Sequence, residues 1–381
     1  MKQHESSTSV TPPFVYRPWL FRWTLALLGL LWPLVWVGSL VTTTDAGMSV
    51  PDWPNTYGDN LLLYPVSTWL SGPFDLFIEH GHRLLGMLVG VVAIAVVVVA
   101  FYSERRRWVQ TLAVAGLVLV IVQGVLGGMR VVLSDRVLAM VHGCTAPIVF
   151  AAFTVLAVAT GRWWWTGRQK PVKLVRRRAS KPAEAAGGGD ESGSGDAAAV
   201  VSTDPRGATR GVTVTAFALI LMAYVQLVLG AQLRHVSMAA PPQQFTHTVA
   251  AHVLLAFVIW AVCVVFWVRI RKCGEMTLSQ PAMLLLGLVS IQILLGLSTW
   301  VVNYGFPMFQ NFGYTARYLV HAKSFWGSFI VCGHVATGSL ILAMAVLLAT
   351  RCVRLRHLAR TATARTAISG TSLAPMRPLE R

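Results

Sequence analysis

Eight stretches of this sequence are almost continuously apolar over the ~20 residues that a helix needs to cross the hydrocarbon core of a bilayer. A chain of 381 residues that is 55% hydrophobic and 12% charged could not bury so much apolar surface in a water-soluble fold. Backbone polar groups in lipid are satisfied only in helices or closed barrels, and a continuous apolar pattern favours helices over the alternating pattern of a barrel. We therefore predict an all-α polytopic membrane protein with spans near 20–43, 82–102, 109–129, 137–160, 211–233, 246–269, 281–302 and 324–350.

Basic residues are distributed unevenly along the chain, and their distribution predicts how the helices are oriented. The formal net charge is +17, and Lys and Arg collect in the N-terminal tail, at 104–107, in 161–210, at 270–280 and after residue 351. Residues 44–81 contain several acidic residues and no Lys or Arg. Because basic loops stay in the cytoplasm, we expect a multi-pass protein of the inner (plasma) membrane with both termini cytoplasmic. This loop-by-loop pattern also argues against nucleic acid as a partner.

A stretch rich in Gly, Ser and Ala separates the chain into two halves. Residues 167–209 contain almost no bulky apolar side chain and so cannot bury enough surface to fold. The halves resemble each other, since Gln123 precedes GVLGG in one and Gln292 precedes ILLG in the other. We therefore predict two pseudo-symmetric four-helix bundles. The expected divisions are a cytoplasmic tail (1–19), the N-terminal bundle (20–160), a cytoplasmic low-complexity linker (161–210), the C-terminal bundle (211–350) and a cytoplasmic tail (351–381).

Four histidines lie inside apolar stretches, two in each half: His82, His142, His252 and His334. An unsatisfied polar group in a bilayer costs several kcal/mol, so each imidazole needs a partner. All four lie at similar depths in the outer part of the predicted membrane region, which favours one bis-histidine haem site in each bundle. His247, five residues before His252, is the competing ligand in the C-terminal half. The alternative is that the histidines bind backbone carbonyls or line a proton path.

Charged residues flank the first of these histidines. Glu79 precedes His82 by three residues, so in a continuous helix its carboxylate shares a face with the imidazole and would lie over a bound metal or substrate. A helix-terminal acid is the alternative interpretation. Arg83 and Arg130, at outer span ends, could pair with haem propionates or only extend toward the interface. His80 is expected to be an exposed or capping histidine.

Several motifs together resemble the haem A synthase family: VGSLVTTTDAGMSVPDWPNTYG, EHGHRLLGM, QGVLGGMRV, LGAQLRH and GHVATGSL. The resemblance covers most of residues 35–350 and implies oxidation of a ring methyl group of haem O to a formyl group, which yields haem A for terminal oxidases. It implies that His82 and His142 bind the iron of the substrate haem, that His252 and His334 bind a haem b cofactor, and that Glu79 is catalytic. Haem O synthase is then an expected partner, together with an electron donor that the sequence does not identify.

One departure from the family bears on its chemistry. Many relatives carry a cysteine pair in the first outer loop, whereas none of this chain's five cysteines lies there. Two other functions remain open. A diheme b-type electron carrier or quinol-linked subunit would also need four histidines, and a transporter could use them in a proton path. The Glu79–His82 pair and the irregular loop 44–81, a candidate lid over an exchangeable haem, favour the enzyme.

Overall fold

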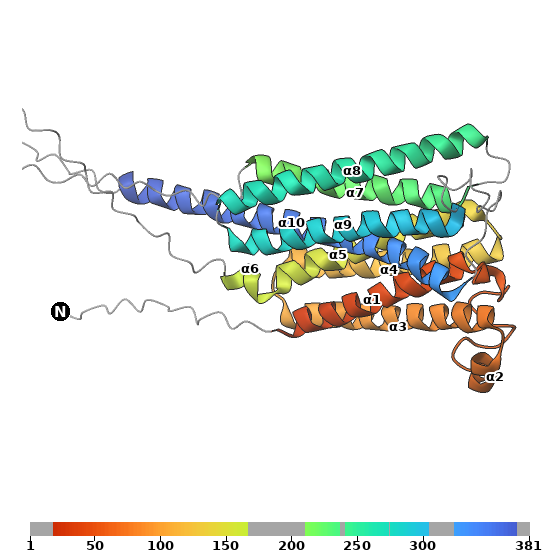
Figure 1. The fold of residues 1–381 in the computed structure, drawn as a ribbon. Helices are drawn as coiled ribbons and strands as arrows, with labels where there is room; N and C mark the ends of the chain where they lie inside the picture. The colour runs from red at the N-terminus through yellow and green to blue at the C-terminus, as the bar shows by residue number, and fades with distance from the viewer. Residues whose placement is uncertain (1–17, 167–209, 237–240, 274, 305–323, 372–381) are drawn as a thin grey trace, which may run out of the picture. The chain divides into compact units, whose positions relative to one another are not determined.

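The computed structural model describes residues 18–166, 210–236, 241–273, 275–304 and 324–371 (Figure 1). Within these ranges the protein is all helical, apart from one isolated bridge between Thr56 and Asp59. Eight helices are long and apolar enough to span a membrane, which confirms the predicted fold class. They are α1 (Trp19–Thr43), α3 (Phe74–Ser103), α4 (Arg107–Val132), α5 (Arg136–Thr160), α7 (Arg210–Arg234), α8 (Pro242–Cys273), α9 (Met276–Tyr304) and α10 (Phe325–Thr371). Shorter helices are η1 (Ala46–Met48), α2 (Val66–Ser71) and α6 (Arg162–Thr166).

The start of α3 differs from the prediction, which placed it at residue 82. The helix begins at Phe74, directly after Pro73 at its N-cap. Residues 74–81 carry polar groups that interrupt the apolar run, so the span predicted from hydropathy began too late to include them. They are nevertheless helical because Leu76 and Ile78 are buried, with 5% and 8% exposure. As a result, Glu79 lies well inside α3.

Two other helices extend past the predicted boundaries. α10 continues to Thr371, although the last span was expected to end at 350 and to be followed by a tail. The residues after 350 are polar and basic, so hydropathy marks where the apolar surface ends but not where the helical backbone ends. α6, with the sequence RWWWT, lies at the start of the segment expected to be linker.

The first four membrane helices form a closed bundle. α1 and α4 each pack against both α3 and α5, which places α3 and α5 at opposite corners. Ala93, Ala113 and Phe153 are almost completely buried in its interior. At Gly116 the absence of a side chain admits the Phe153 ring, since an added Cβ would lie 2.7 Å from Phe153 Cζ. The connection between α1 and α3 lies at one end of this bundle, which we call the loop end.

The chain divides into two compact units whose boundaries cross several helices. The first contains Met1–Trp165, Ala231–Met238 and Leu295–Ser339, and the second contains Thr166–Gly230, Ala239–Leu294 and Leu340–Arg381. The first unit therefore includes the N-terminal bundle together with ends of α7, α9 and α10.

Polar and aromatic contacts join these helix ends to α1 within the first unit. Arg234 donates to Ser39 Oγ at 3.0 Å, to Ser39 O at 3.1 Å and to Thr43 Oγ1 at 2.9 Å. Trp36 packs against Phe329, with ring centroids 5.0 Å apart. One face of α1 thus contacts α3, and another contacts segments from the C-terminal half of the chain.

The second unit is also held by contacts between consecutive helices. Trp260 Nε1 of α8 donates to Ser290 Oγ of α9 at 3.1 Å. Arg351 Nη1 of α10 donates to Thr277 O of α9 at 2.7 Å. Side-chain donors thus bridge helices whose own backbone hydrogen bonds are complete, which suits helix association in an apolar environment.

Candidate functional site

Each of the four histidines predicted to bind haem iron packs the edge of its ring against a glycine. In the N-terminal bundle, a Cβ added at Gly38 of α1 would lie 2.8 Å from His82 Cε1, and one added at Gly127 of α4 would lie 3.0 Å from His142 Cε1. Contacts below about 3.4 Å are tighter than most Cβ contacts, so a side chain at either glycine would displace the imidazole. These glycines are therefore needed for the observed ring positions.

The same contact recurs in the C-terminal half. Within the first unit, a Cβ at Gly296 of α9 would lie 3.1 Å from His334 Cε1. Within the second unit, a Cβ at Gly230 of α7 would lie 3.2 Å from His252 Cε1. In every case the glycine lies on the membrane helix that precedes the histidine's helix in the chain. Four equivalent contacts, two in each half, are consistent with the predicted internal repeat.

Glutamines add a second repeated contact. Gln123 Nε2 donates to His142 O at 2.6 Å, and Gln226 Nε2 donates to His252 O at 2.9 Å. Each glutamine lies four residues before the glycine that touches the same histidine. Gln292 has the same spacing to Gly296. Sequence reasoning noticed Gln123 and Gln292 but missed Gln226, which the Gln-x-x-x-Gly spacing would have revealed.

The environments of the N-terminal imidazoles suit metal ligation. His142 Nδ1 lies 3.1 Å from Gln123 O, so a proton on Nδ1 is donated to this carbonyl and Nε2 keeps its lone pair for a ligand. His82 Nδ1 is buried without a hydrogen-bond partner among the described residues. His82 and His142 lie on α3 and α5, the two helices at opposite corners of the bundle.

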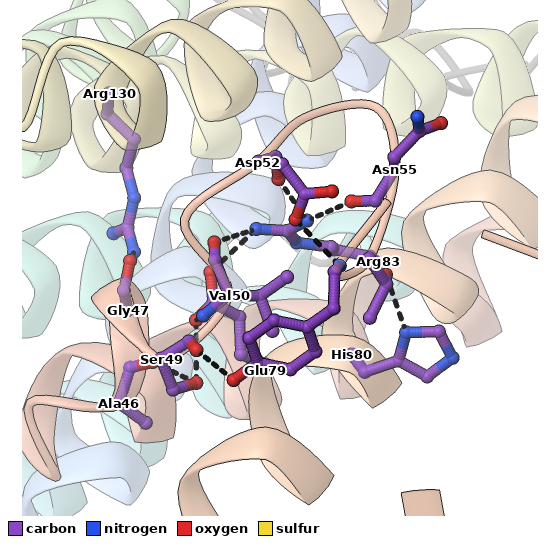
Figure 2. Close-up of polar contacts among 12 residues, drawn as sticks. Ala46, Gly47, Ser49, Val50, Asp52, Asn55, Glu79, His80, Arg83 and Arg130 are labelled. Carbon is purple, nitrogen blue, oxygen red and sulfur yellow. Dashed lines mark hydrogen bonds and ion pairs between the residues drawn. The ribbon is translucent and has the colours of Figure 1, made fainter. Parts of the chain in front are cut away.

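The carboxylate of Glu79 is buried, with 3% of the residue exposed, and is surrounded by donors. Its Oε2 accepts from Ser49 Oγ at 2.8 Å and from the Val50 N–H at 3.0 Å (Figure 2). Its Oε1 accepts from Arg83 Nη2 at 2.9 Å. All three partners donate, which suits an anionic carboxylate. Since α3 is continuous here, Glu79 lies about one helical turn from His82.

Arg83 holds the connection between α1 and α3 in place. Its Nη1 donates to Asp52 O at 2.7 Å and to Asn55 O at 2.8 Å, and its Nη2 donates to Val50 O at 2.8 Å as well as to Glu79 (Figure 2). A guanidinium has two N–H groups on each of these nitrogens, so all four are occupied within the chain. Any contact between Arg83 and an external carboxylate would have to use Nε.

Arg130, from α4, reaches the same connection from the other side. Its Nη2 donates to Gly47 O at 2.9 Å, and Figure 2 shows the side chain extending to this carbonyl. The guanidinium is half-buried and makes no other hydrogen bond to the described residues, so it keeps donors for a ligand. Of the two arginines predicted to pair with haem propionates, Arg130 is therefore the one that keeps unused N–H donors.

His80 is buried, with 1% exposure, so the expectation of an exposed or capping histidine was wrong. Its Nδ1 lies 3.0 Å from Thr56 Oγ1, and its ring lies 5.1 Å from that of Tyr64 and 5.4 Å from that of Trp69. The reason is tertiary: α3 begins earlier than the apolar pattern implied, and the preceding connection folds over its first turns. His80 thus anchors this connection to the helix.

Asp52 closes the turn that carries the PDWP sequence. Its carboxylate accepts from the Tyr57 N–H at 2.9 Å and from the Gly58 N–H at 2.8 Å. Burial raises the pKa of Asp52, but the hydrogen bonds from Gly58 and Tyr57 outweigh this, so the pKa lies below its usual value. The neighbouring Trp53 places its indole against Gly128 of α4, where an added Cβ would overlap the ring.

The competing C-terminal ligand has a different environment. His247 is exposed on α8, whereas His252 is half-buried and contacts Gly230 and Gln226. The repeated contacts therefore single out His252 rather than His247.

Comparisons with known proteins show which family and which relatives this chain resembles. Residues 21–187 match the COX15-CtaA family model, described as cytochrome oxidase assembly protein. A Heme A synthase of Alkalihalophilus pseudofirmus is 31% identical over 131 residues, which are 33% of this chain and 42% of that protein. A Heme A synthase of Shouchella clausii is 34% identical over 136 residues, or 34% of this chain and 41% of that protein.

A third relative has a different name. A Protoheme IX farnesyltransferase of Haloarcula marismortui is 32% identical over 126 residues, which are 33% of this chain and 25% of that protein. The chain thus spans less than half the length of each of these three curated relatives.

Proposed function

We propose that this chain is a member of the COX15-CtaA family of cytochrome oxidase assembly proteins, whose model matches residues 21–187, and that it is a membrane oxidoreductase that converts haem O to haem A. The observation that carries the proposal is the arrangement at the loop end of the N-terminal bundle. There His82 and His142 lie on α3 and α5, at opposite corners of the bundle, each ring rests against a glycine of a neighbouring helix, and Glu79 lies one turn from His82.

The substrate haem would bind between His82 and His142. Both imidazoles are fixed by glycine contacts, and the hydrogen bond from His142 Nδ1 to Gln123 O leaves Nε2 available for iron. Arg130 would contribute its unused donors to a propionate at the same end of the bundle. The oxidation replaces hydrogens of a ring methyl group by a formyl oxygen, so protons and electrons must leave the site.

Glu79 is suited to move those protons. Its carboxylate is buried, while its partner Ser49 is only half-buried, so the hydrogen bond between them connects the interior with the loop surface. We expect Glu79 Oε2 to accept a proton from the reacting group. The Ser49 hydroxyl would take up this proton as it releases its own proton toward the loop surface. The guanidinium of Arg83 compensates for the negative charge before and after transfer.

A resident haem b would be held by His252 and His334. Within its own unit, each ring has a glycine contact of the kind seen in the N-terminal bundle, and Gln226 also donates to the His252 carbonyl. When bound, haem b supplies one-electron transfer, which the oxidation requires. With the basic segments inside, the protein would lie in the inner (plasma) membrane and receive haem O from haem O synthase.

The test is extraction of haem from membranes of cells that express this chain together with haem O synthase, followed by mass analysis. Haem A should appear only when both proteins are present. A diheme b-type electron carrier is the second candidate, because four equivalent His–Gly contacts suit it equally well. Haem b and unmodified haem O as the only products, from a chain that binds haem, would favour the carrier.

A further inference from the structure

We propose that Trp53 is a positioning residue for the haem bound between His82 and His142, and that the connection containing it must open for this haem to exchange. The inference rests on the proposed function for the identity of the ligand. It goes beyond that function because it assigns a role to a residue outside the helices that carry the two histidines.

The first observation is that the connection touches positions adjacent to both histidines. On α3 it is bound by Glu79, one turn before His82, and by Arg83, the next residue after it. On α4 it is bound by Arg130, three residues after the Gly127 that touches His142. The segment therefore joins α3 and α4, through Glu79 and Arg83 on one side and Arg130 on the other (Figure 2).

The second observation is the contact of Trp53 with α4. Its indole lies against Gly128, and the neighbouring Gly127 lies against His142. Successive glycines on α4 thus contact the loop residue and the candidate iron ligand. Trp53 is nevertheless 42% exposed, so part of its ring is free to contact a ligand.

The third observation is that the Trp53 backbone has little freedom. Arg83 binds the carbonyls of Asp52 and Asn55 on either side of it, and the Asp52 carboxylate closes the following turn. A rigid aromatic side chain on a fixed backbone is suited to orient a flat apolar ligand. It would limit rotation of the macrocycle between the histidines and keep water from its edge.

The experiment measures haem release from the full-length protein to an excess of apomyoglobin. The protein is loaded with iron protoporphyrin IX, and the phase that is absent in His82→Ala is assigned to the N-terminal site. Trp53→Ala should speed this phase by about tenfold or more, because the contact holds the bound state. Gly128→Ala should have a similar effect, since its Cβ would overlap the indole and push it away.

Two matched variants make the result specific. Gly124→Ala lies on the same helix and its Cβ would meet nothing within 4 Å, so its release rate should stay within about twofold of the wild type. If Gly128→Ala acts through Trp53, adding it to Trp53→Ala should cause no further acceleration. Wild-type release rates in both Trp53→Ala and Gly128→Ala would overturn the proposal.

Failure of the proposed function gives a different result. A wild-type protein that binds haem but makes no haem A would refute the enzyme assignment, while the release rates would still decide the role of Trp53. Conversely, haem A formation with unchanged release in the Trp53 and Gly128 variants would leave the enzyme intact and remove the positioning role.

Discussion

Gly38 lies so close to His82 that a Cβ at this glycine would come within 2.8 Å of the imidazole Cε1. The two residues are on different helices, α1 and α3, and form the tightest of four equivalent contacts. The position of a candidate iron ligand is therefore set by the absence of a side chain on the neighbouring helix.

Gly38→Ala should weaken haem binding in the N-terminal site by about tenfold or more, because the new methyl group tilts the ring away from the iron axis. Titration of the haem-depleted protein with haem, followed by Soret absorbance, measures the effect. Gly29→Ala on the same helix is the control, since its Cβ would meet nothing within 4 Å. Equal affinities for the two variants would contradict the assigned role of Gly38.

In the C-terminal half, Gly230→Ala and Gly296→Ala should lower the content of haem b per protein after purification. The Cβ atoms would lie 3.2 Å from His252 Cε1 and 3.1 Å from His334 Cε1, so the ligand rings must move. A haem assay of the purified protein gives the content, with Gly287→Ala as the control because its Cβ meets nothing within 4 Å.

Substitution of the histidines themselves should lower the haem b content more than substitution of the glycines. His252→Ala or His334→Ala should abolish the resident haem b. If His252→Ala keeps its full haem content, the ligand assignment moves to His247.

Glu79→Gln should keep bound haem but reduce formation of haem A by about a hundredfold or more, the usual contribution of a group that transfers protons. Glutamine preserves the shape of the side chain and removes its proton affinity. The measurement is the ratio of haem A to haem O by mass analysis after co-expression with haem O synthase.

Ser49→Ala separates proton transfer from a purely structural role of Glu79. It removes one donor to Oε2 but leaves the carboxylate and its contacts with Val50 and Arg83. We expect a loss smaller than that of Glu79→Gln. Wild-type haem A formation in Glu79→Gln would show that the carboxylate takes no part in the chemistry.

The turn closed by Asp52 should be stable at neutral pH and open in acid. The pKa of Asp52 is lowered from 3.8 in the folded protein, so its ionised form stabilises the turn at pH values above 3.8, and this stabilisation is lost as the pH falls through the lower folded pKa. Hydrogen exchange of the Tyr57 and Gly58 amides as a function of pH measures it. In Asp52→Asn the exchange, corrected for its intrinsic pH dependence, should lose this transition.

The membrane helices and their histidines follow from local sequence. Run length and hydropathy are enough to predict spans, because a helix in lipid must be apolar over a fixed length. The Gln-x-x-x-Gly spacing at Gln226 is equally local and can be recognised from the sequence. The start of α3 could not be predicted from the sequence. The polar residues Glu79 and His80 suggest the end of an apolar span, and only the burial of Leu76 and Ile78 in the fold shows that the helix begins earlier.

By itself, the sequence determined that this is a helical protein with eight apolar spans and with two histidines inside the apolar stretches of each half, since composition and periodicity act along the chain. Only the tertiary structure decided which groups meet. In the folded chain His80 is buried against Thr56, the guanidinium of Arg83 donates to loop carbonyls, and the indole of Trp53 packs against Gly128. These contacts join residues far apart in the chain. The partners of Arg83 and Trp53 are backbone carbonyls and a glycine, which carry no side-chain signal for a sequence pattern to reveal.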